Sequence, residues 1–133
     1  MRVLIWASAL QADVLALSLR LDRDSETDLL IVAPNPETYL KEPIAKKRPI
    51  SCPILSMYAS DTWSRAKEFG ADVVVVDNHF PDPGLAPRLF VMWHGLGFKA
   101  RGQRDLADFY EKVRDATGFD PRGPNPHFLA QCY

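Results

Sequence analysis

Four consecutive valines, Val73–Val76, lie between two aspartates, and this run limits most strongly what the chain can fold into. Valine is β-branched and therefore suits a strand. A run without polar alternation has to be buried on both faces, which is typical of parallel sheets covered by helices. The valine run predicts a central strand of such a sheet.

Further apolar runs of the same kind alternate with helical patterns along the chain. The expected strands are residues 3–7, 28–33, 54–58, 72–77 and 89–93. The expected helices, from apolar residues at helical spacing, are residues 12–22, 61–69 and 105–116. This alternation predicts an α/β fold, a Rossmann-like three-layer α/β/α domain with a mainly parallel sheet.

The segment between residues 36 and 53 fits this alternation less well. Residues 37–40 are expected to form a helical turn, and Pro43, Pro49 and Pro53 are expected to break anything longer. The basic run at 46–48 is then expected to be a solvated loop. Contact with anionic lipid or polymeric phosphate is the alternative.

Length and composition define the class of protein further. A chain of 133 residues suits one domain, here residues 1–133 with an irregular Pro/Gly-rich tail at 119–133. The net charge of -1 argues against binding to nucleic acid. The apolar stretches of the chain are shorter than the ~20 residues that a membrane-spanning helix needs. Cys52 and Cys132 lack metal-ligand spacing and are expected to be reduced thiols of a cytoplasmic protein.

The strand expected at residues 89–93 ends in His94 and Gly95. Ligands of open α/β sheets bind at the carboxyl ends of strands, so an imidazole there is a candidate general base or phosphate ligand. A structural histidine bonded to a neighbouring carbonyl is the alternative. The next residues, with Gly97, Lys99 and Arg101, form a glycine-rich turn that carries two cations.

This turn matches neither the phosphate-binding P-loop nor the dinucleotide fingerprint. Backbone amides around Gly95 and Gly97 can still bind an anion whose charge Lys99 or Arg101 neutralises. The alternative is an ordinary turn with solvated cations.

A second histidine, His79, follows the valine strand. If the strands before His79 and His94 are neighbours, both residues project from one edge of the sheet. Asp77 or Asp82 is then a candidate carboxylate to orient an imidazole. A structural role for His79 is the alternative. A metal is not expected, because no third ligand has suitable spacing.

Together these motifs resemble a known family. The segment Asn78-His79-Phe80-Pro81, followed by Trp93-His94-Gly95 and by Lys99, is similar to the CDP-glycerol glycerophosphotransferases, over about residues 72–104. These enzymes build teichoic-acid-type polymers of bacterial cell walls and share the two-domain GT-B architecture of many glycosyltransferases. The Trp-His-Gly motif belongs to their N-terminal half, with a lysine five residues after the histidine.

The resemblance implies roles for these residues. His94 would be the catalytic base that deprotonates an acceptor hydroxyl, and Lys99 would stabilise charge nearby. Asn78, His79, Gly95, Gly97 and Arg101 would join in binding substrate or its phosphate. One departure is Leu96-Gly97-Phe98, where the family usually has Thr-Pro-Leu.

The resemblance also implies partners. A nucleotide-activated donor would bind through a C-terminal domain for which 133 residues leave no room, and the acceptor would be a polyol- or sugar-phosphate. No cofactor is expected. The protein is expected in the cytoplasm, and peripheral association of the full protein with the inner face of the membrane stays open.

Two other functions remain as alternatives to the transferase. One is a stand-alone, non-catalytic Rossmann-like module that binds an anion, a nucleotide or another protein. The other is a flavodoxin-like receiver domain, which has the least support because Ser8 to Gln11 supply no acidic cluster after the first strand.

Overall fold

A computed structural model describes residues 1–77, 81, 84–92, 111 and 114–115 of the chain. Its elements in chain order are β1 (Arg2–Trp6), α1 (Ala12–Leu21), β2 (Asp28–Ala33), α2 (Pro36–Lys41), α3 (Pro43–Lys47), β3 (Ile54–Ser56), α4 (Thr62–Phe69), β4 (Val73–Val76) and β5 (Leu89–Val91).

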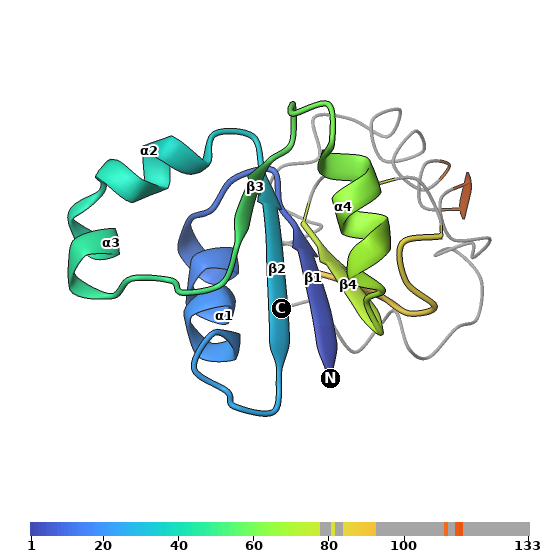
Figure 1. The fold of residues 1–133 in the computed structure, drawn as a ribbon, viewed down its shortest axis with the longest axis horizontal. Helices are drawn as coiled ribbons and strands as arrows, with labels where there is room; N and C mark the ends of the chain where they lie inside the picture. Colours follow the sequence, from blue (N-terminus) through green and yellow to red (C-terminus); the bar gives the residue numbers. More distant parts are fainter. Residues whose placement is uncertain (78–80, 82–83, 93–110, 112–113, 116–133) are drawn as a thin grey trace.

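The five strands form one parallel sheet in the order β3-β2-β1-β4-β5. The chain begins in the middle of this sheet, builds β2 and β3 on one side, and then crosses over to build β4 and β5 on the other (Figure 1). Val3 pairs with Leu29 on one side and with Val73 on the other. The predicted α/β Rossmann-like fold with a parallel sheet is confirmed.

Side chains alternate between the two faces of the sheet and build a core on each. On β1, Leu4 and Trp6 belong to one core, and Val3 and Ile5 belong to the other. This explains why the strand shows no polar alternation: all four of these side chains are 9% exposed or less. Each fully buried side chain of this size contributes about 1.5–3 kcal/mol to the free energy of folding.

Helices α1 and α4 cover opposite faces of the sheet (Figure 1). Helix α1 packs on the Val3 and Ile5 face, and α4 packs on the Leu4 and Trp6 face. There, Trp63 of α4 meets Trp6 edge to face, with ring centroids 5.9 Å apart. Helix α4 ends at Gly70, which has the left-handed φ of +60° typical of a helix C-terminus.

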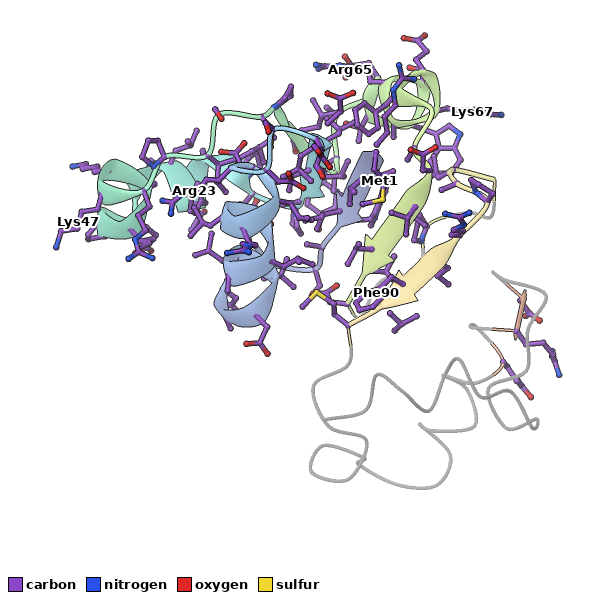
Figure 2. All side chains as sticks on the ribbon, turned by 90° about the horizontal axis from the view of Figure 1, so that it is seen from below. Met1, Arg23, Lys47, Arg65, Lys67 and Phe90 are labelled. Carbon is purple, nitrogen blue, oxygen red and sulfur yellow. The ribbon has the colours of Figure 1, made fainter. Side chains whose placement is uncertain are left out.

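The segment between β2 and β3 is more helical than predicted. Helix α2 ends at Lys41, before Pro43, as predicted. Pro43 then occupies the first turn of a further helix that was not predicted, α3, where the missing N–H of proline costs no hydrogen bond. The basic run at 46–48 is therefore the exposed end of this short helix and not a loop. Lys47 at the end of α3 and Lys67 of α4 project from opposite sides of the domain (Figure 2).

The expected helix at 105–116 lies mostly outside the described residues; within it, Glu111, Arg114 and Asp115 are helical. The expected tail at 119–133 lies outside them altogether.

Asp22, the residue after α1, anchors the segment that leads into β3. Its carboxylate accepts hydrogen bonds from the Ser51 amide at 2.9 Å, the Ser51 hydroxyl at 2.9 Å and the Cys52 amide at 2.8 Å. Partial burial pushes the pKa of Asp22 upward, but the hydrogen bonds from Ser51 and Cys52 outweigh this and leave the pKa below its usual value.

Replacing this carboxylate by Asp22→Ala is expected to lower the free energy of unfolding by about 1 kcal/mol, a value reduced by the partial exposure of the site. Because the pKa of Asp22 is lowered in the folded state, its contribution is present above the usual aspartate pKa and is lost as the pH falls through the lowered value. Urea unfolding at pH 7 and at pH 3 measures both effects. Ser25→Ala, at a nearby exposed position, is the control. An equal loss at both pH values would contradict the assignment.

Candidate functional site

The carboxyl edge of the sheet is where this topology places a site. The strands β2 and β3 are added on one side of β1, and β4 and β5 are added on the other, so the strand order switches between β1 and β4. In open α/β sheets, ligands bind outside the carboxyl ends of the strands at such a switch point. Strands β4 and β5 end at this same edge, since Val76 pairs with Val91 and the Met92 amide donates to the Val76 carbonyl at 2.7 Å. The two strands that precede His79 and His94 are therefore parallel neighbours.

The residues predicted to carry chemistry follow β4 and β5 in the sequence but lie outside the described residues. They are Asn78, His79, Asp82, His94, Gly95, Gly97, Lys99 and Arg101. Their roles stay predictions.

At the switch point, a buried carboxylate connects the ends of β1 and β4. Asp77 directly follows β4 and is 3% exposed. It accepts a hydrogen bond from the Ser8 amide at 2.8 Å and another from the Ser8 hydroxyl. The sequence predicted Asp77 as an orienting carboxylate for a histidine, and the structure shows that it positions the loop after β1.

Removing this carboxylate with Asp77→Ala is expected to lower the free energy of unfolding by about 2–3 kcal/mol, because it leaves the Ser8 donors without their acceptor. Ser8→Ala removes one donor only and is expected to cost about 1 kcal/mol. Urea unfolding of both single variants and of the double variant tests the link. If the loss of stability in the double variant equals the sum of the two single losses, the residues are not coupled.

Next to this link lies a cleft of about 430 Å³ between the loop after β1 and the segment after β2. Its described lining residues are Ser8, Ala9, Leu10, Gln11, Ala12, Leu15, Ala33, Pro34, Asn35, Thr38, Tyr39, Glu42 and Ile44. We call it the α1–α2 cleft. Its volume lies within the range of small-molecule sites.

Hydrogen bonds outside the α1–α2 cleft fix the position of its walls. Tyr39 is buried, and its hydroxyl donates to the Arg48 carbonyl at 3.2 Å, which ties α2 to the end of α3. On the other wall, Ser8 is fixed by Asp77. This cleft was not predicted from the sequence. The available signal was Asn35, a hydrogen-bonding side chain between two prolines directly after a buried strand.

A second hollow of about 580 Å³ lies at the opposite edge, near the amino ends of the strands. It contains Asp22 and Cys52, and Cys52 is a free thiol. Burial, followed by the nearby Asp22 carboxylate, raises the pKa of the Cys52 thiol to about 12. A thiol that stays protonated at neutral pH is a poor nucleophile, so Cys52 is not a candidate catalytic nucleophile.

Cys52 is therefore expected to react with iodoacetamide at pH 8 about a hundredfold or more slowly in the folded protein than in guanidinium chloride, because the reactive species is the thiolate. Mass spectrometry of the peptide that contains Cys52 gives this rate apart from that of Cys132. Equal rates in the two conditions would show that the thiol is not held in its protonated form.

The described residues contain no group of three or more histidine, cysteine, aspartate or glutamate side chains placed to bind a metal ion. Among them, too, no helix has the length and apolar character needed to cross a membrane.

No protein-family model, curated protein or solved structure matches this chain. The candidate site consequently depends on three features of this chain: the shared edge of β4 and β5, the link between Ser8 and Asp77, and the α1–α2 cleft.

Proposed function

We propose that this chain is the acceptor-side domain of a GT-B-type glycerophospho- or glycosyltransferase similar to the CDP-glycerol glycerophosphotransferases. The observation that carries the proposal is the pairing of β4 with β5 next to the switch point. It brings the points where the Asn78-His79 segment and the Trp93-His94-Gly95 segment leave the sheet to one edge. Two separate parts of the family-like pattern thus begin beside each other.

In the proposed reaction His94 acts as general base and takes the proton of an acceptor hydroxyl. The resulting oxygen nucleophile attacks the β-phosphorus of CDP-glycerol, a new phosphodiester bond forms, and CMP leaves. Lys99 and Arg101 supply positive charge near the transferring phosphate, assisted by the backbone amides around Gly95 and Gly97. Asn78 and His79 contact the substrate from the neighbouring strand end.

In this proposal the two substrates bind to different domains. The donor nucleotide binds to a C-terminal domain, and this domain holds the polyol- or sugar-phosphate acceptor and the base. The buried Asp77 fixes the loop after β1 at the same edge of this domain.

In a protein that combines this domain with its donor-binding domain, His94→Ala is expected to reduce CMP release from CDP-glycerol by about 100-fold or more, because the base is lost. Release of CMP is measured with a coupled nucleotide assay. Lys46→Ala, an exposed cation on α3, is the matched control and is expected to keep full activity. Full activity in His94→Ala would refute the proposed mechanism.

The 133-residue chain alone provides an independent test. Titration calorimetry with CDP-glycerol is expected to show weak binding or none, because the donor site is assigned to the other domain. Micromolar affinity would mean that this chain is the donor half.

A further inference from the structure

We propose that the α1–α2 cleft binds an uncharged polyhydroxylated ligand, a sugar ring or a linear polyol, and does not bind phosphate. The cleft lies at the carboxyl edge of the sheet, its volume of about 430 Å³ suits a small molecule, and its wall carries exposed polar side chains that do not cap the helices they precede.

Three of these groups stand at the starts of helices. Gln11, Asn35 and Glu42 are the residues before α1, α2 and α3, and all three line the cleft. A residue at this position commonly bonds its side chain to the first turn of the helix, and asparagine does so with high preference. Within the described part of the chain, none of these three side chains forms such a capping bond. Two amides and one carboxylate are thus left to bond a ligand.

These groups match the hydroxyls of a sugar or a polyol. Each amide of Gln11 and Asn35 offers both a donor and an acceptor, and the Glu42 carboxylate offers acceptors. A hydroxyl can donate to the one and accept from the other. Thr38 adds a hydroxyl of its own from α2. Between these polar groups, Leu10, Pro34 and Ile44 provide apolar surface for the C–H faces of a ring or chain.

Charge argues against phosphate in this cleft. Of the described lining residues none is lysine or arginine, and Glu42 is a carboxylate that would repel an anion. A nucleoside is also disfavoured, because the aromatic residue among the described lining is Tyr39, which is 4% exposed and offers no open ring face for a base to stack on.

The position of the cleft connects it to the edge where chemistry is proposed. Ser8 lines the cleft and is bonded to Asp77, the residue after β4. A sugar or polyol in the cleft therefore lies one strand away from the end of β4. The identification of this ligand as the hydroxyl-bearing part of the acceptor rests on the proposed function. Its binding in the cleft does not depend on that function.

The test is an NMR titration of the 133-residue chain with methyl β-D-glucopyranoside and with ribitol. At least one of them is expected to shift the amide signals of Leu10, Asn35 and Thr38, with a dissociation constant of about millimolar strength. sn-Glycerol 3-phosphate and cytidine are expected to leave these signals unshifted at the same concentration.

Two substitutions locate the binding. Thr38→Trp, at an exposed position of α2, is expected to fill the cleft and abolish the shifts. Asn35→Ala is expected to weaken binding about three- to tenfold through the lost hydrogen bonds. Lys41→Trp is the matched control, because Lys41 lies on the same helix, is exposed and is not among the cleft residues, so it should bind as the native chain does. Circular dichroism shows whether each variant is folded.

The proposal is overturned if neither methyl β-D-glucopyranoside nor ribitol shifts these signals, if glycerol 3-phosphate or cytidine binds more tightly than both, or if Thr38→Trp binds as well as Lys41→Trp. The His94→Ala variant separates this proposal from the proposed function. Sugar or polyol binding should persist in it, whatever its effect on CMP release.

Discussion

Burial of β1 on both faces is the constraint on which the rest of this domain depends. The strand lies between β2 and β4, and four of its five side chains are packed into one core or the other. A strand buried in this way needs a helical layer on each side, which α1 and α4 supply. It also needs neighbours at both edges, so the chain has to build the sheet first in one direction and then in the other. The switch point is thus a direct result of starting the sheet in its middle.

That switch point leaves polar groups at the edge of a dry core, and the fold satisfies them in a specific way. The Ser8 amide follows β1 and receives its acceptor from the buried Asp77 carboxylate after β4. A buried carboxylate is costly unless its hydrogen bonds are made, so this pair fixes the spacing of the two strand ends. It also sets the loop that forms one wall of the α1–α2 cleft. Stability and site geometry therefore rest on the same contact.

The parts of the fold that follow from local patterns could be predicted from sequence. The valine run at 73–76 and the strand at 28–33 were located correctly, because apolar β-branched runs without alternation have few other solutions. Helix α3 was missed, because Pro43 was read as a breaker and not as a first-turn residue. The α1–α2 cleft was missed for a different reason. Its hydrogen-bonding residues, Gln11, Asn35 and Glu42, are spread over about thirty positions and meet only through the order of the strands.

The strand order also bears on the size of an acceptor under the proposed function. The α1–α2 cleft lies beyond the ends of β1 and β2, whereas Lys99 and Arg101 follow β5, which β4 separates from β1. The strands β1 and β5 themselves are two strand spacings, or about 10 Å, apart. The described lining of the cleft offers hydroxyl-binding groups and contains no lysine or arginine, whereas the two cations of the family-like motif come after β5 in the sequence. Under the proposed function, a ligand that used both the cleft and these cations would carry hydroxyls at one end and phosphate at the other, as an extended polyol phosphate does.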